Sequence, residues 1–130
     1  MAEGPQLGDV VAAAFPVRQP RGHEQEGMRP SVVVGLPDRL GVERFPMLVV
    51  VPFTTFKNQL WVMSAPALYP RFTAGAGGLK MASVALLDQV VAIDATRIRS
   101  IQGKLEAEQY DLLHSGLARI FGFSKVNQYF

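Results

Sequence analysis

Residues 47–53 (Met-Leu-Val-Val-Val-Pro-Phe) form the most hydrophobic stretch of this chain. The stretch is rich in β-branched side chains, which favours a β-strand over a helix. A strand with one face in water would alternate apolar and polar residues, and this one does not alternate. We therefore expect a strand that is buried on both faces, as in the middle of a small closed barrel, and that carries Thr54 and Thr55 to the rim.

Several other apolar segments lie between glycine and proline turns, a pattern that predicts further short strands. They cover residues 8–15, 31–35 and 97–101, with residues 80–94 as one long strand or two short ones separated by Asp88-Gln89. Residues 56–73 lack a clear period and predict an irregular excursion that contains a strand fragment or two. The glycine-rich residues 74–78 predict a flexible turn.

One segment near the C-terminus has the period of a helix. Tyr110, Leu113 and Leu117 follow one another at spacings of three and four residues, Ile120 and Phe121 come three and four residues after Leu117, and Gly122 follows. Short strands, tight turns and a single terminal helix predict a mainly β protein with a C-terminal helix, in the form of a small SH3-like β-barrel.

Length and composition restrict the class of protein. A chain of 130 residues fits one domain, residues 1–130, that buries a core of its own. Cysteine is absent and histidine occurs twice, so neither a disulfide framework nor a metal centre is expected. The N-terminus lacks the features of a secretion signal, and the apolar runs are too short to cross a membrane, which predicts a soluble, cytoplasmic protein.

The formal net charge is only +2, but the positive charge is unevenly distributed. Six basic residues stand against two acidic ones, Asp88 and Asp94, between positions 57 and 104. This modest surplus is compatible with phosphate binding, although a surplus of this size is more often a solvated face.

The polar run of residues 22–30 (Gly-His-Glu-Gln-Glu-Gly-Met-Arg-Pro) joins two predicted strands. Gly22 and Gly27 allow positive φ angles and close approach of a ligand. Pro30 favours an extended conformation for Arg29 at the start of the next strand. One short run therefore contains a histidine, two carboxylates and an arginine whose backbone is restricted, which indicates a candidate reactive site. The alternative is a solvated loop whose charges only keep the protein soluble.

This run, read as Gly22-x-Glu24-Gln25-x-Gly27-x-Arg29-Pro30, resembles the signature of the PemK/MazF-like toxin ribonucleases of bacterial toxin–antitoxin systems. Three more segments follow the family's order and approximate spacing, so that the resemblance covers residues 8 to about 122. They are Gly8-Asp9-Val10-Val11, Val51-Pro52-Phe53-Thr54-Thr55, and Asp88-Gln89-Val90 continuing to Asp94 and Arg97.

The resemblance implies an mRNA interferase, an endoribonuclease that cleaves single-stranded mRNA at specific sequences and inhibits growth. It assigns a central catalytic role to Arg29 and a phosphate-binding hydroxyl to Thr54. A guanidinium binds two phosphate oxygens at once and neutralises the charge that develops during phosphoryl transfer. The alternative for Arg29 is a structural ion pair with Glu24 or Glu26.

The proton of a ribose 2′-hydroxyl needs a general base, and the sequence offers His23 and Glu24. Histidine side chains exchange protons near neutral pH. Glu24 belongs to the more widely shared part of the motif, but it could equally hold the loop or orient Arg29. The sequence leaves the two candidates open.

The remaining candidates would bind the substrate. They are Gln25 in the loop, Thr55 at the strand end, Phe56 and Lys57 just after it, and Asp88. Asp88 matches an acidic position of one branch of the family, but Leu86 stands where that branch has an arginine, so Asp88 could instead cap a strand bend. Trp61, like Phe56, is a candidate for stacking on a base or for core packing.

No cofactor and no metal are expected. The resemblance implies a homodimer and a cognate antitoxin with an acidic, disordered segment that occupies the RNA groove. The hydrophobic tail of residues 121–130, with Phe123, Val126, Tyr129 and Phe130, is consistent with an interface. Two alternatives remain: a toxin of the same fold that binds DNA gyrase without cleaving RNA, and a non-catalytic barrel that binds RNA or a peptide.

Overall fold

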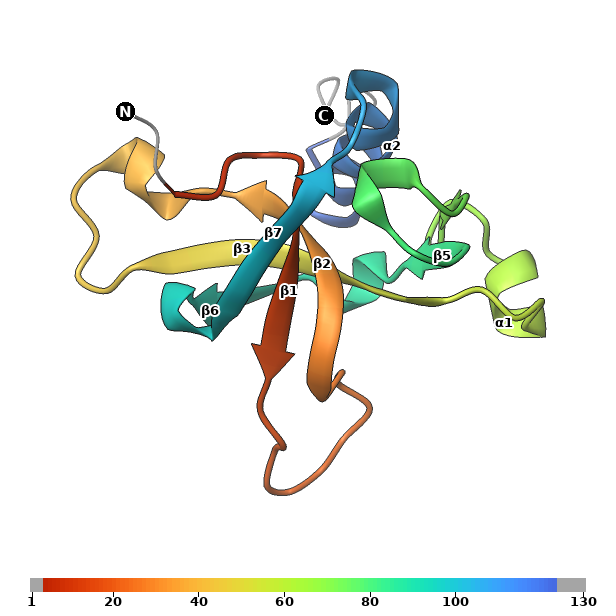
Figure 1. Cartoon of the computed structure of the whole chain (residues 1–130), viewed down its shortest axis with the longest axis horizontal. Coiled ribbons are helices and arrows are strands. Elements are labelled where there is room, and N and C mark those ends of the chain that lie inside the picture. The colour runs from red at the N-terminus through yellow and green to blue at the C-terminus, as the bar shows by residue number, and fades with distance from the viewer. Residues whose placement is uncertain (1–3, 124–130) are drawn as a thin grey trace.

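The computed structural model describes residues 4–123. Seven antiparallel strands form one sheet, and the longer helix packs near one end of it (Figure 1). The strands are β1 (Asp9–Phe15), β2 (Gly27–Gly35), β3 (Met47–Thr55), β4 (Arg71–Phe72), β5 (Ser83–Ala85), β6 (Val91–Asp94) and β7 (Ile98–Lys104). The helices are α1 (Leu60–Met63) and α2 (Ala107–Ile120), and 3₁₀ turns occur at η1 (Pro37–Leu40), η2 (Ala76–Gly78), η3 (Leu87–Gln89) and η4 (Ala95–Arg97). The prediction of a mainly β chain with a C-terminal helix is confirmed.

β3 is the central strand. It pairs with β2 along one edge, and along the other edge it pairs first with β6 and then with β5. Val51 and Phe53 point into a core cluster that includes Leu113 and Leu117 of α2. The side chains of Leu48 and Val50 point to the opposite face, into a second cluster with Val11 and Val33. The absence of alternation in the sequence therefore reflects burial on both faces, as predicted.

The sheet does not close into a complete barrel. The strand order is β4-β5-β3-β2-β1-β7, and within residues 4–123 no ladder joins β4 to β7. The 3₁₀ turn η2 packs against β7 instead, which closes that side by van der Waals contact rather than by hydrogen-bonded strands. The sheet is thus barrel-like at most, and the predicted closure of the barrel is wrong.

Some predicted boundaries differ from the structure. β2 begins at Gly27 and not at residue 31, so Arg29 and Pro30 belong to a strand and the loop is confined to residues 16–26. The excursion over residues 56–73 contains the expected strand fragment, β4, but also the helical turn α1. Residues 80–94 form two short strands, β5 and β6, separated by a 3₁₀ turn at Asp88-Gln89, as one of the two alternatives predicted.

Helix α2 begins with a capping box. The Glu106 side chain accepts from the backbone of Gln109, and the Gln109 side chain accepts from the Glu106 backbone N–H at 2.8 Å. Leu113 and Leu117 form its buried stripe. The helix predicted from periodicity is confirmed, whereas Val126, Tyr129 and Phe130 of the predicted hydrophobic tail lie outside the described residues.

The glycine-rich turn is tightly packed. A Cβ added to Gly103 on β7 would lie 2.5 Å from the Gly77 carbonyl oxygen, and one added to Gly78 would lie 2.5 Å from the Gln102 carbonyl oxygen. Gly77 and Gly78 also have positive φ angles, +56° and +80°. Glycines at these positions therefore let two backbones touch and fix the segment that follows, Leu79 to Met81.

This packing gives a stability prediction. Gly103→Ala places a methyl group against backbone atoms that cannot rotate away, so we expect the free energy of unfolding to fall by about 1–3 kcal/mol. Urea denaturation measures the change. Gly4→Ala is the control, because nothing lies within 4 Å of a Cβ at Gly4. Equal stability of the two variants would contradict the described contact.

Candidate functional site

The site lies where β2 and β3 separate. Their ladder ends at the pair Ser31–Pro52, next to Pro30, and neither proline has an N–H group to donate. Beyond this point β3 pairs with β5 on its other side, while residues 27–30 of β2 pair only with β1. The start of β2 and the end of β3 therefore line a gap instead of a ladder.

This gap is a cavity of about 230 Å³, here called the strand-end cavity. Its lining residues are Met28, Arg29, Pro30, Phe53, Thr54, Thr55, Leu79, Lys80, Met81, Ser83 and Gln102. Two of them are cationic, three carry hydroxyl groups and none is acidic. Such a lining is suited to a phosphate group, because cations and neutral donors stabilise it without a competing carboxylate.

Three of the predicted residues meet in the strand-end cavity: Arg29, Thr54 and Thr55. Alternation along β2 puts Arg29 on the same face of the sheet as Val33. In the ladder between β1 and β2, Arg29 is paired with Ala13. In the described part of the chain, neither threonine hydroxyl has a hydrogen-bond partner, so both remain available as donors.

The guanidinium of Arg29 is not held by an acidic side chain. Its Nε donates to the backbone carbonyl oxygen of Glu26 at 3.2 Å, and over residues 4–123 no carboxylate forms an ion pair with it. The Glu26 carboxylate instead accepts two hydrogen bonds from Arg21, at 2.6 and 3.2 Å. The predicted alternative of a structural ion pair with Glu24 or Glu26 is therefore wrong.

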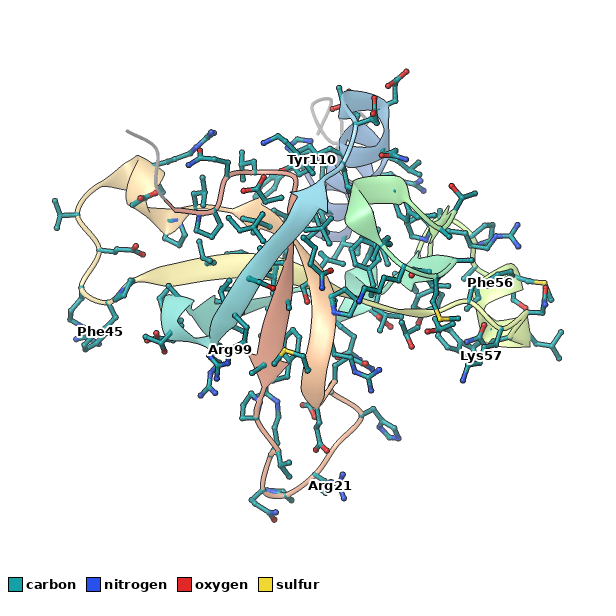
Figure 2. All side chains as sticks on the ribbon, in the orientation of Figure 1. Arg21, Phe45, Phe56, Lys57, Arg99 and Tyr110 are labelled. Carbon is teal, nitrogen blue, oxygen red and sulfur yellow. The ribbon has the colours of Figure 1, made fainter. Side chains whose placement is uncertain are left out.

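Arg21 also changes the acidity of its partner. Hydrogen bonding to the Arg21 guanidinium lowers the pKa of Glu26, and the charge of Arg21 adds to this effect. The same bond raises the pKa of Arg21. The pair keeps the Glu26 carboxylate ionised and bound to Arg21, which lies near the tip of the β1–β2 loop (Figure 2).

The β1–β2 loop forms a second cavity of about 270 Å³, the loop cavity, which shares Arg29 with the strand-end cavity. Its other lining residues are Arg21, Gly22, His23, Glu24, Gln25 and Glu26. Both predicted general bases, His23 and Glu24, thus line a cavity together with Arg29. A hydrogen bond of 3.2 Å from Gln89 Nε2 to the His23 carbonyl oxygen anchors this loop to η3.

The two loop glycines have different roles. Gly27 has a φ of +81°, as predicted, and starts β2. Gly22 does not have a positive φ, and that part of the prediction is wrong. A Cβ at Gly22 would instead lie 2.6 Å from Glu24 Oε1, so the glycine makes room for the Glu24 carboxylate.

A third cavity of about 120 Å³, the turn pocket, lies between the loop and η3. Its lining residues are Phe15, Arg18, Glu24, Gln25, Pro52, Asp88, Gln89, Val90 and Val91. The predicted residues Gln25 and Asp88 therefore meet here rather than in the strand-end cavity. Asp88 Oδ2 accepts a hydrogen bond of 2.6 Å from the Tyr69 hydroxyl, and this bond raises the pKa of Tyr69 to about 12.

Phe56 and Lys57 line none of these three cavities. They lie beside α1 (Figure 2), where the Arg71 guanidinium covers the Phe56 ring at 4.8 Å. Trp61 packs edge-on against Tyr69, with ring centroids 4.9 Å apart. Substrate binding by Phe56 and Lys57 stays a prediction, and the geometry places them apart from the residues around Arg29.

The sequence interpretation missed Arg18, Lys80 and Gln102 as site residues. Lys80 counted only toward the basic surplus, and its position depends on the contact between η2 and β7. Gln102 lies on β7, far along the chain from the motif. Arg18 precedes the motif and has no marker of its own in the sequence.

Residues 4–123 contain neither a cluster of metal ligands nor a membrane-spanning helix. No group of three or more histidine, aspartate or glutamate side chains is arranged to hold a metal ion. No helix in this range has the length and apolar character of a membrane span. The expectation that the protein uses no metal stays a prediction.

Comparison with known proteins identifies the family. Residues 6–121 match the family described as PemK-like, MazF-like toxin of type II toxin–antitoxin system, and the chain belongs to this family. No curated protein matches the chain significantly.

Solved structures with a similar fold include MazF from Deinococcus radiodurans, which is 21% identical with a TM-score of 0.70 over 92% of this chain and 98% of that one. An endoribonuclease from a mycobacterial species, solved with its cognate antitoxin, is 13% identical with a TM-score of 0.63, covering 92% and 96%. The Mycobacterium tuberculosis toxin MazF-mt6 is 20% identical with a TM-score of 0.60, covering 87% and 95%. At these identities the likeness establishes the fold.

The Arg21–Glu26 pair gives a testable pKa. In the native protein the Glu26 pKa lies below the usual glutamate value of about 4.3. The interaction therefore stabilises the loop above that value and is lost as the pH falls through the lowered pKa. Arg21→Ala is expected to raise the Glu26 pKa toward the ordinary value, because the largest lowering cause is removed, as measured by NMR titration of its side-chain carboxyl carbon.

Arg39→Ala is the matched control for this titration, because Arg39 lies in η1 and not in the loop. It should leave the Glu26 titration unchanged. An identical Glu26 midpoint in the wild type and in Arg21→Ala would show that the pair does not form in solution.

Proposed function

We propose that this protein is the toxin of a type II toxin–antitoxin system and acts as an endoribonuclease on single-stranded mRNA. The observation that carries the proposal is the composition of the strand-end cavity, where Arg29 and Lys80 meet the Thr54 and Thr55 hydroxyls with no acidic residue in the lining. This cavity can hold the scissile phosphate. Membership of the toxin family, and a fold shared with a protein named as an endoribonuclease, support the same activity.

In the proposed reaction Arg29 binds the non-bridging phosphate oxygens and stabilises the charge that builds on them in the transition state. Its guanidinium is available because Glu26 is paired with Arg21 and contributes only a backbone carbonyl to Arg29. Thr54 donates its hydroxyl to one of these oxygens. An arginine is unsuitable as the base because its pKa exceeds 12.

The ribose 2′-oxygen attacks the adjacent phosphorus, forming a new O–P bond while the bond to the 5′-oxygen breaks. The products are a 2′,3′-cyclic phosphate and a 5′-hydroxyl, which takes up one proton. The proton of the 2′-hydroxyl passes to His23 or Glu24, the two candidates that line the loop cavity together with Arg29. Comparing His23→Gln with Glu24→Gln separates the two candidates. The substitution that removes the base should lower kcat strongly and change KM little.

The mechanism uses an internal nucleophile and needs no metal. An RNA oligonucleotide should be cleaved in excess chelator, whereas the same oligonucleotide with 2′-deoxy sugars should remain intact. Cleavage of the deoxy strand, or loss of activity in chelator, would contradict this mechanism.

Substitution of Arg29 is the direct test of the site. Arg29→Ala should lower kcat by about 10²–10³-fold while the protein keeps its fold, because a principal transition-state donor is lost. Arg29→Lys keeps the positive charge but loses the bidentate geometry, so its kcat should lie between those of the wild type and Arg29→Ala. Rates are measured on a labelled single-stranded RNA, with Arg39→Ala as the control.

The same variant separates the other function classes. A toxin that binds DNA gyrase would be largely indifferent to Arg29→Ala, and a barrel that only binds RNA or a peptide would cleave no RNA in either form. Unaltered growth inhibition by the Arg29→Ala protein would therefore contradict the nuclease proposal, since the Arg29 side chain would then have no part in toxicity.

We further propose a homodimer that is neutralised by a cognate antitoxin. Structures of similar fold include an endoribonuclease with its cognate antitoxin and MazE–MazF from D. radiodurans. Exposed apolar side chains gather where α2 ends, with Ile120 46%, Phe121 55% and Phe123 80% exposed, and they offer an apolar contact surface. An acidic antitoxin segment would compete with RNA for the cations Arg29 and Lys80.

We expect light scattering at micromolar concentration to give twice the mass of one chain. The antitoxin should inhibit cleavage competitively, raising KM for RNA and leaving kcat unchanged. A one-chain mass over this concentration range, or an antitoxin complex that still cleaves RNA, would contradict the arrangement.

A further inference from the structure

The turn pocket is built differently from the strand-end cavity. Its walls include the apolar side chains of Phe15, Val90 and Val91, together with the ring of Pro52. Its polar groups are one arginine, Arg18, two carboxylates and two amides. Because Glu24 and Asp88 outnumber the single cation, the pocket disfavours a phosphate and accepts a flat, neutral, partly apolar group.

The turn pocket is connected to the reactive region. It shares Glu24 and Gln25 with the loop cavity, which in turn shares Arg29 with the strand-end cavity. A nucleic-acid strand whose phosphate lies at Arg29 therefore has a path across the loop to the turn pocket. A base displaced from stacking near the cut is the group that such a path brings there.

Two polar atoms of this pocket's residues lack partners. Arg18 Nε and Gln25 Oε1 are shielded from solvent, and neither forms a hydrogen bond in the described structure. A buried polar atom without a partner destabilises the protein, so each such atom requires an explanation. Both side chains are themselves partly exposed and line the turn pocket, so a ligand there would lie next to both of them.

The pocket is also held in shape from both sides. On the loop side, Gln89 donates to the His23 carbonyl oxygen at 3.2 Å. On the other side, Asp88 accepts from the Tyr69 hydroxyl at 2.6 Å. These bonds keep η3 and the loop at a fixed separation, which is required of a pocket that selects its ligand by shape and hydrogen bonding.

We propose that the turn pocket receives one unstacked nucleobase next to the cut, with Arg18 donating to an acceptor on its edge and Gln25 accepting from a donor. Arg18 and Gln25 are then specificity-determining residues at one position of the RNA. This inference rests on the proposed ribonuclease function, which it deepens by assigning base selection to a pocket separate from the phosphate site.

The test maps cleavage ends on a long, defined single-stranded RNA. Wild type should prefer one base at a fixed position near the cut. Arg18→Gln and Gln25→Leu should each reduce the preference at that position by about tenfold or more, and they should leave the preferences at other positions in place. Val90→Phe, which fills the pocket without changing its polar groups, should act at the same position.

Arg39→Gln is the control and should keep the wild-type pattern, because Arg39 does not line the turn pocket. Wild-type cleavage with unchanged preferences in all three pocket variants overturns this inference and leaves the ribonuclease proposal standing. Absence of cleavage by wild type overturns the ribonuclease proposal instead.

A binding measurement decides the case of a folded variant that does not cleave. Fluorescence anisotropy compares 2′-deoxy oligonucleotides that differ only in the base at the selected position, with circular dichroism as the check of folding. Equal affinity of the variant for both oligonucleotides supports the pocket, and a retained difference overturns it.

Discussion

The functional architecture depends on the end of the β2–β3 ladder at Ser31 and Pro52. Prolines at positions 30 and 52 supply no N–H group, so the two strands stop pairing there while each keeps its other partner, β1 or β5. The sheet therefore remains stable although its centre opens. Arg29 and Thr54 flank this opening on strands whose buried parts fix their positions, which is the rigidity that the proposed reaction requires.

Charge is divided between the loop and the sheet. The Arg21–Glu26 pair removes the acidic group nearest in sequence to Arg29, and the Glu26 backbone carbonyl orients the arginine without neutralising it. The strand-end cavity is consequently cationic, whereas the turn pocket contains two carboxylates and one arginine. Adjacent cavities of different charge and polarity suit a ligand that alternates phosphates and bases along its length.

The cationic side of the site also depends on a backbone contact far from the motif. Gly77, Gly78 and Gly103 bring η2 against β7, and Lys80 and Gln102 reach the strand-end cavity as a result. The same contact covers the side where the sheet does not close. The sequence predicts a flexible turn at residues 74–78, but three glycines in two backbone segments pack there at distances that leave no space for a Cβ atom.

The sequence by itself determined the central strand, the C-terminal helix and the order of the motif residues, because hydrophobic periodicity and turn chemistry are local properties. It also indicated Arg29, Thr54 and Thr55, which the structure brings into one cavity. Only the tertiary structure decided that Glu26 pairs with Arg21 and that Asp88 accepts a hydrogen bond from Tyr69. It also decided that Lys80 lines the same cavity as Arg29, and that Arg18 lines the same pocket as Gln25. These arrangements depend on strand register and on contacts between segments that are tens of residues apart in the sequence. Such contacts produce no periodic pattern in the sequence.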